Sequence, residues 1–308
     1  MDTAFPVCGI VAEYNPFHSG HRFHIERTRE MLGEHTIIVC AMSGNFVQRG
    51  DFAVLDKYAR AEAAVRGGAD LVLELPLAAA LSSAEGFARG AVALLHGIGC
   101  RYLSFGAETA DLSLVRQAAE ALNALPPAAG NRSGLSYAAY RQQELAALNP
   151  AAAAPVTLPE GAMLTLLRAA LFRGALATGS ADGFDERCAA AVYSAVSFSD
   201  AVEKAQTRRF PAARVRRTLL RAALGISPDA SPLPSYARVL AFSSRGRTLL
   251  RQQVGLPLIV KPVTEKQLPD ALQPSLRLDA FADDLFGLAR PAPLPGGEHY
   301  RKTPFYLT

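Results

Sequence analysis

An α/β fold built on a doubly wound, mainly parallel sheet is the architecture that this sequence predicts, and two observations carry the prediction. The first hundred residues alternate short β-branched runs with longer helical patterns, as parallel strands joined by crossover helices do. Polar loops follow the first, second and fourth predicted strands. Because right-handed crossovers bring the carboxyl ends of parallel strands to one edge, we expect these three loops to meet there.

The elements of the first half follow from apolar runs and the residues that interrupt them. Gly67-Gly68 is expected to stop the second helix, Pro76 to end the third strand, and Ser82 or Ser83 to cap the third helix. Strands are predicted over residues 7–11, 36–41, 70–75 and 101–105, and helices over residues 20–32, 55–66, 82–95 and 112–125.

A change of composition marks the expected domain boundary near residue 155. Pro126-Pro127 and the alanine- and proline-rich residues 149–159 interrupt the alternating pattern. Residues 1–155 are therefore predicted to form the sheet domain and residues 156–308 a mainly helical domain. The second half is expected to contain helices over 160–176, 185–195, 198–206 and 211–224, strand-like pieces over 239–242 and 258–260, and a proline-rich tail.

The amino-acid composition is typical of a globular protein. Half of the 308 residues are hydrophobic, 19% are charged and the formal net charge is +4, which together indicate a globular chain. Cys8, Cys40, Cys100 and Cys188 include no C-x-x-C pair, so neither a zinc site nor a disulfide framework is predicted. No basic leader precedes the first apolar run, and no apolar stretch reaches 18 residues. The sequence therefore predicts a cytoplasmic protein with no membrane partner.

The motif that carries most chemistry is His18-Ser19-Gly20-His21, between the first predicted strand and helix. Phosphate binding needs backbone N–H groups aimed at an anion, a small residue for close approach, and side-chain donors. Gly20 lets a nucleotide lie against the backbone, the two histidines can donate to phosphate oxygens, and the helix presents its positive end. Residues 7–24 are therefore predicted to bind a nucleotide, with attack at the α-phosphate of ATP and release of pyrophosphate.

This segment resembles the opening of a known family. Residues 9–21 are similar to the first segment of the bacterial tRNA(Met) cytidine acetate ligases, members of the HxGH nucleotidylyltransferase superfamily, and this resemblance implies a Rossmann-like sheet. Similar segments follow in the same order over residues 41–51, 56–60, 68–76 and 104–108, and more diverged ones over 182–187, 207–210 and 256–259.

The resemblance implies an ATP-dependent ligase that forms a carbon–nitrogen bond. Such an enzyme activates acetate as acetyl-adenylate, with ATP and Mg²⁺, and then acetylates N4 of the wobble cytidine of elongator tRNA(Met). His18 and His21 would stabilise the transition state at the α-phosphate. The nucleotide contacts that the family implies fall on Val11, Ala12, Glu13, Tyr14, Asn15, Pro16, Phe17, His18, Ser19, Gly20, His21, His24 and Gly106.

One segment of the family pattern is missing. After Gly134-Leu135-Ser136-Tyr137 the family continues to a Ser-x-Thr-x-x-Arg motif that helps to hold the nucleotide, whereas this chain passes through an alanine run to residues 158–161. No Ser-x-Thr-x-x-Arg occurs anywhere in the sequence. Charge on the β- and γ-phosphates would then be met by Arg49, Lys57, Mg²⁺ or another chain.

Two further groups of residues are candidates for binding. Ser43, Gln48 and Arg49 lie in the polar loop after the second strand, with Lys57 just beyond, and are expected at the active-site edge. A basic segment supplies candidate contacts to tRNA phosphates, and a solvated helix face is an equal alternative for it because no aromatic pattern accompanies the charges. These candidates are Arg208, Arg209, Arg214, Arg217 and Arg221, the last three sharing one helical face by their spacing.

Among the isolated polar residues, Glu74 and Glu108 follow strand ends, where a carboxylate can hold Mg²⁺, and a structural role is favoured for Glu74. His35, His96 and His299 have no partner that the sequence identifies. No metal-ligand set made of protein side chains is predicted.

Two other functions remain open at this point. The missing segment is also compatible with a non-catalytic nucleotide- or RNA-binding relative. Since HxGH does not specify the acceptor, an adenylyltransferase acting on a small phosphorylated metabolite is the third reading.

Overall fold

A computed structural model gives the fold of this chain and describes residues 5–106, 113, 116–117, 160–172, 184–227, 229–252, 254–263, 267–290 and 296–308. The strands are β1 (Val7–Ala12), β2 (Ile37–Ser43), β3 (Phe46–Val47), β4 (Asp51–Phe52), β5 (Leu71–Leu75), β6 (Tyr102–Ser104), β7 (Ala237–Ser243), β8 (Leu258–Ile259) and β9 (Phe305–Leu307). The α-helices are α1 (Ser19–Leu32), α2 (Lys57–Arg66), α3 (Leu77–Ala80), α4 (Ala84–Gly97), α7 (Glu160–Phe172), α8 (Phe184–Ser194), α9 (Phe198–Ala205), α10 (Ala212–Leu224), α11 (Ser244–Leu250) and α12 (Gln273–Leu288).

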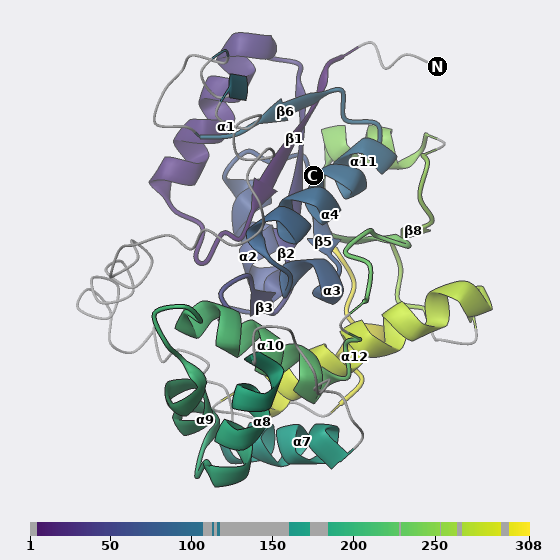
Figure 1. Cartoon of the computed structure of the whole chain (residues 1–308). Helices are drawn as coiled ribbons and strands as arrows, with labels where there is room; N and C mark the ends of the chain where they lie inside the picture. The colour runs from purple at the N-terminus through teal and green to yellow at the C-terminus, as the bar shows by residue number, and fades with distance from the viewer. Residues whose placement is uncertain are drawn as a thin grey trace. The chain divides into compact units, whose positions relative to one another are not determined.

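The main sheet has the strand order β6-β1-β2-β5-β7-β8, with β9 paired to β7 (Figure 1). β1 is parallel to both β2 and β6, and β2 is parallel to β5. The chain therefore builds the sheet outward from β1 in one direction and then returns to add β6 on the other side. This reversal at β1 confirms the doubly wound prediction and brings the loops that follow β1, β2 and β6 to one edge.

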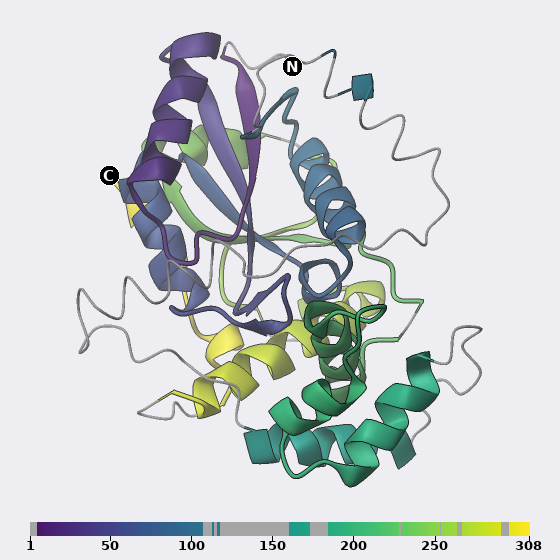
Figure 2. The ribbon, with the colours of Figure 1, turned by 60° about the vertical axis from the view of Figure 1, so that its left-hand side comes forward.

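Alternate residues of the central strands bury opposite faces of the sheet. Ile37, Val39 and Ala41 face a core completed by α4 and α11, whereas Ile38, Cys40 and Met42 face a core completed by α1 and α2. Figure 2 shows α1 and α4 on opposite sides of the sheet. Because β2 is covered on both faces, all seven of its residues are buried, as expected for an apolar strand within a parallel sheet.

The second half of the chain contributes strands to the same sheet. β7 pairs with β5 in antiparallel register, and β8 and β9 both pair with β7. Residues 1–104 and 155–308 accordingly form one compact unit. The division into domains at residue 155 stays a prediction, to which the structure adds that the later strands complete the sheet of the earlier half.

Helices α7 to α10 and α12 pack around an apolar core that also includes Phe46 and Phe52 of the hairpin, and these helices confirm the mainly helical second half. α12 was not expected, because the sequence predicted a proline-rich tail after residue 260. Pro274 lies in the first turn of this helix, where its missing N–H leaves no intrahelical bond unmade. The chain from residue 273 to 288 is therefore a helix with a buried face, and the tail prediction was wrong there.

Some predictions fall outside the described residues. The helix predicted over 112–125 is described at residues 113, 116 and 117, which are helical, and the breaks at 126–127 and 149–159 are not among the described residues. Among the helices of the described ranges, none combines the length and apolar character that crossing a bilayer requires.

Candidate active site

The loop from Glu13 to His18 leaves the carboxyl end of β1 and leads directly into α1. The Asn15–Pro16 peptide bond is cis, and Tyr14 has a positive φ of 45°, at which the chain leaves the extended direction of the strand. Asn15 fixes the turn by accepting a hydrogen bond from the backbone N–H of Val54 at 2.7 Å. The side chain of Tyr14 is buried below the loop and contacts the edge of the His21 ring. The turn thus aims the amino end of α1 at the edge where the strand order reverses.

His18 and His21 form a stacked pair at the beginning of α1. Their ring centroids are 3.7 Å apart with an interplanar angle of 26°. His18 is the N-cap residue, and its Nδ1 accepts a hydrogen bond from the backbone N–H of Gly20 at 3.1 Å. His21 Nδ1 accepts in turn from the backbone N–H of His18 at 3.2 Å, which completes a capping box. Both rings are therefore held by the same backbone groups that begin the helix.

This hydrogen bonding selects one tautomer of each histidine. A neutral imidazole carries its hydrogen on a single nitrogen, and Nδ1 of both rings is an acceptor here. The hydrogen must then lie on Nε2 of both rings. The pair therefore carries two Nε2–H groups at the amino end of α1, where the helix dipole also favours negative charge.

Arg60, on α2, is a buried residue that the sequence did not single out. Its guanidinium donates to the backbone carbonyls of Ser43, Gly44 and Glu13, and its Nε donates to Leu55. Burial lowers the pKa of Arg60 to about 10, and the Glu13 carboxylate opposes that change. Arg60 thus ties the loop after β1 to the loop after β2.

The Glu13 side chain adds a second link between these loops. Its carboxylate accepts from the backbone N–H of Gln48 at 2.6 Å. Burial raises the pKa of Glu13, while the hydrogen bond from Gln48 and the charges of Arg60 and Arg49 act in the opposite direction. Arg49 directly follows Gln48, so its backbone lies beside this link.

The predicted loop after β2 is a β-hairpin made of β3, β4 and the turn 48–50. Arg216 pairs with Asp51 at 2.9 Å, and Arg217 donates to the Gln48 carbonyl at 3.4 Å, so α10 holds the turn from one side. Gly50 has a φ of 80°, and a Cβ there would lie 2.9 Å from the backbone nitrogen of Arg217. Glycine is therefore required for this close approach. Arg49, at the tip, is exposed.

Some of the other candidate site residues have structural partners. His24 is half-buried and its Nε2 lies 2.8 Å from Oγ of Ser104, which ties α1 to β6. Burial lowers the pKa of His24, so the neutral form is favoured. Ser43 is the last residue of β2, and its carbonyl accepts from Arg60. Gly106 follows the end of β6 by two residues along the chain.

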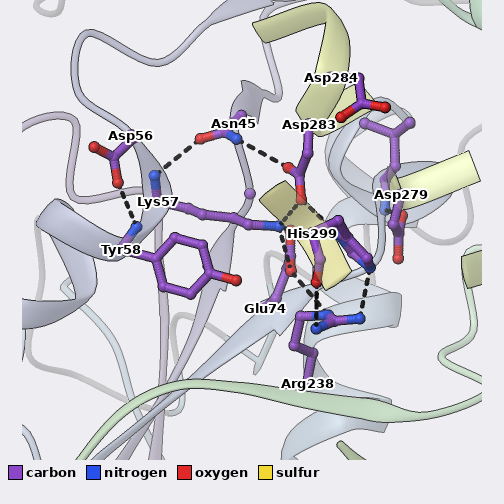
Figure 3. A network of polar contacts seen from close by, with 12 residues as sticks. Asn45, Asp56, Lys57, Tyr58, Glu74, Arg238, Asp279, Asp283, Asp284 and His299 are labelled. Carbon is purple, nitrogen blue, oxygen red and sulfur yellow. Dashed lines mark hydrogen bonds and ion pairs between the residues drawn. The ribbon is translucent and has the colours of Figure 1, made fainter. Parts of the chain in front are cut away.

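Lys57 lies in a buried network of charges instead of in the active-site loop (Figure 3). Its Nζ contacts both carboxylate oxygens of Glu74, at 2.6 and 2.8 Å, and Asp283 of α12 at 2.6 Å. Its side chain is 1% exposed. Burial disfavours the ammonium, yet Asp283 and Glu74 outweigh it and raise the pKa of Lys57. Its three donors are engaged by carboxylates, so the structure gives no support to the predicted contact of Lys57 with phosphates.

His299, for which the sequence identified no partner, joins this network from the C-terminal segment. Its Nδ1 donates to Asp283, and its Nε2 accepts from Arg238 of β7. Asn45, at the base of the hairpin, donates to the other oxygen of Asp283 at 2.9 Å. The network therefore links β5, α2 and the hairpin to α12 and the C-terminal segment.

The environment of His299 predicts a loss of stability in acid. Burial lowers the pKa of His299, with Lys57 and Arg238 adding to the effect and Asp283 opposing it. An unfolded histidine has a pKa of about 6.5, so below that pH the unfolded chain binds more protons than the folded one. The contribution of neutral His299 to the free energy of unfolding is fully present above about pH 6.5. It is lost as the pH falls through the pKa of His299 in the folded protein. Urea unfolding of the wild type and of His299→Gln between about pH 5 and 7.5 tests this, and equal slopes against pH in both would contradict it.

The basic stripe of α10 is divided between two environments. Arg217 and Arg221 are half-buried, and Arg221 donates to the carbonyls of Ala78 and Ser227. Arg214 is exposed and stacks over the rings of Phe184 and Phe210. Arg208 and Arg209 are also exposed. Arg217 and Arg221 thus have tertiary contacts, and contact of the five arginines with tRNA stays a prediction.

Within the described part of the chain, no group of three or more His, Cys, Asp or Glu side chains is arranged to hold a metal ion.

The sequence of this chain is similar to those of known proteins. The tRNA(Met) cytidine acetate ligase of Acetivibrio thermocellus is 28% identical over 394 aligned positions, which cover 91% of this chain and 94% of that protein. The protein of the same name from Syntrophotalea carbinolica is 42% identical over 179 positions, 56% of this chain and 42% of that relative. The alignment with the first is longer than this chain, so that relative contains residues that are absent here.

The fold also matches solved structures. The crystal structure of Thermotoga maritima TmcAL bound with alpha-thio ATP superimposes with a TM-score of 0.82 at 24% identity, covering 98% of this chain and all of that one. Its apo form gives a TM-score of 0.81 at 23% identity. The family model of the HIGH nucleotidyl transferases matches residues 5–165 and 165–296. The chain therefore belongs to the HIGH nucleotidyl transferase family.

Proposed function

We propose that this protein is an ATP-dependent tRNA(Met) cytidine acetate ligase. The observation that carries the proposal is the pair of Nε2–H donors on His18 and His21, held at the amino end of α1 where the strand order reverses. Such a pair is suited to the charge that develops on an α-phosphate during displacement. The name shared by the relatives from Acetivibrio thermocellus and Syntrophotalea carbinolica supports acetate and tRNA(Met) as the substrates.

The reaction has two displacements. In the first, a carboxylate oxygen of acetate forms a bond to the α-phosphorus of ATP while the bond to the β-phosphate oxygen breaks and pyrophosphate leaves. In the second, N4 of the wobble cytidine attacks the acetyl carbonyl, AMP leaves, and N4 loses one proton. His18 and His21 would bind the α-phosphate oxygens in the first step, because donors fixed before the reaction need no reorganisation during it.

The nucleotide would lie along the loop from Val11 to His21, and the contact that the family resemblance implies at Gly106 stays a prediction. Mg²⁺ would be bound mainly by the phosphates, as is usual for this ion, and would neutralise charge on the leaving pyrophosphate. The Glu13 and Arg60 contacts contribute by keeping the loops after β1 and β2 in a fixed relation.

Transfer of labelled acetate to elongator tRNA(Met) tests the proposal. The expected result is label on N4 of the wobble cytidine that depends on ATP and on Mg²⁺. A folded protein that binds tRNA but neither binds ATP nor transfers label would contradict it and would indicate a non-catalytic relative, which the absence of Ser-x-Thr-x-x-Arg from the sequence makes a specific alternative. Adenylylation of a small phosphorylated metabolite, with tRNA ignored, would likewise contradict it.

A further inference from the structure

The residues on both sides of Arg49, at the tip of the β3–β4 hairpin, are held by contacts with the rest of the protein. The backbone N–H of Gln48 donates to Glu13, and the Gln48 carbonyl accepts from Arg217. Gly50 packs against the backbone of α10, and Asp51 pairs with Arg216. A well-fixed backbone that carries one exposed charged side chain is suited to present that side chain to a ligand.

Arg49 differs from the other cations that border the hairpin. Arg60 donates to four carbonyls, Arg216 is paired with Asp51, and Arg217 donates to Gln48. Arg49 has no hydrogen bond or ion pair with any residue that the structure describes. It directly follows Gln48, whose backbone N–H donates to the Glu13 carboxylate at 2.6 Å. Of these four cations, Arg49 is therefore the one with a guanidinium available to an anion at the end of β1.

β1 lies between β2 and β6. On the β2 flank, the hairpin carries Arg49 next to Gln48, whose backbone N–H donates to Glu13 just after the end of β1. A displacement at the α-phosphorus brings two anions to this edge, the attacking carboxylate and the polyphosphate. A single guanidinium matches the two oxygens of one carboxylate in a bidentate pair. A triphosphate carries several charges, and the neighbouring Glu13 makes this flank less favourable for it than for a monoanion.

We infer that Arg49 binds the carboxylate of the acid substrate and orients it for attack on the α-phosphorus. This assignment rests on the proposed function and adds a residue that determines which substrate is used. The hairpin, held between Glu13 and α10, fixes the position from which the acid approaches. Arg49 would thus act on the acid, while His18 and His21 act on the phosphate.

The test compares Arg49→Met and Arg49→Lys with Arg66→Met in acetate-dependent exchange of pyrophosphate into ATP. Arg66 is a matched control, because it is also exposed but lies at the carboxyl end of α2, paired with Glu62. Arg49→Met is expected to raise the KM for acetate by about 10- to 100-fold, the usual effect of losing a charged hydrogen-bond pair. The KM for ATP and the melting temperature should stay near those of the wild type, and Arg49→Lys should give an intermediate KM for acetate because it keeps the charge but not the bidentate geometry.

The outcomes separate this inference from the proposed function. If the wild type shows no acetate-dependent exchange, both fail together. If the wild type is active and Arg49→Met leaves the KM for acetate unchanged, or raises the KM for ATP instead, the assignment of Arg49 to the acid is wrong and the proposed function still stands.

Discussion

His18→Asn is expected to lower the rate of pyrophosphate release by about 10²- to 10³-fold, the usual effect of removing one donor from a site that stabilises developing anionic charge. Asparagine is a strong N-cap residue, and its side-chain oxygen can accept from the Gly20 N–H as Nδ1 of His18 does. The substitution therefore removes the Nε2–H donor and keeps the helix cap.

His21→Gln applies the same logic to the second histidine. Glutamine is a preferred residue at the third position of a capping box, so its side-chain oxygen can accept from the His18 N–H. We expect a loss of rate of similar size with an unchanged melting temperature. The rate of pyrophosphate release and the melting temperature are measured for both variants. A rate near that of the wild type in either variant would show that the substituted histidine does not act in the reaction. His18→Ala is the useful comparison, since it should also cost about 1 kcal/mol of stability through loss of the cap.

The sequence predicted the sheet well because the relevant information is local. β1, β2 and β5 are short apolar runs bounded by polar or glycine-containing breakers, and each was located to within two residues. The position of the nucleotide loop followed from the same pattern, since a loop after the first strand of such a sheet lies where the strand order reverses. What the spacing did not reveal is that His18 and His21 share a capping box, which depends on the orientation of their rings.

The spacing of Lys57 in the sequence already indicated a buried position. Lys57, Arg60, Ala61 and Ala64 occupy positions i, i+3, i+4 and i+7 of α2, and all four are buried. Alanines at this spacing indicate a helix face that packs against the core. Lys57 and Arg60 lie on the same face, so their burial is expected. The charge of Lys57 suggested contact with the phosphates of a nucleotide, whereas the helical periodicity indicated a position in the protein interior.

Its partners could not be identified by the same reasoning. Asp283 is 226 positions away from Lys57 along the chain, in a segment whose prolines predicted an irregular tail. In the sequence, Asp283 and His299 are polar residues of the kind that usually lies at the surface. In the structure both are buried where α12 packs against the sheet. Pairings between distant residues are set by tertiary structure, and a single sequence carries no local signal for them.

The arginine stripe of α10 gives an intermediate case. The i, i+3, i+7 spacing correctly placed Arg214, Arg217 and Arg221 on related positions of a helix. Spacing does not specify what a face contacts, however, and two of the three arginines donate to backbone carbonyls of the neighbouring hairpin and α3. Long arginine side chains serve such packing as readily as they serve nucleic acids.

Lys57→Met is expected to lower the free energy of unfolding by about 3 to 5 kcal/mol, the range found when one partner of a buried ion pair is removed. Methionine fills most of the space of the lysine stem, so the loss arises mainly from charge. Glu74 and Asp283 would remain buried without their shared counterion, and the nearest other cation contact is that of Arg238 with Glu74 at 3.8 Å. Urea unfolding at neutral pH measures the change.

Two further variants show whether charge is the cause. Arg66→Met removes a cation from an ion pair whose side chains are 58% and 40% exposed, and it should cost no more than about 1 kcal/mol. Adding Asp283→Asn to Lys57→Met removes one of the two stranded carboxylate charges, so the double variant should be less destabilised than the sum of the single changes. Strict additivity would mean that Lys57 and Asp283 act independently, and the contact between them would then carry no coupling energy despite its 2.6 Å separation.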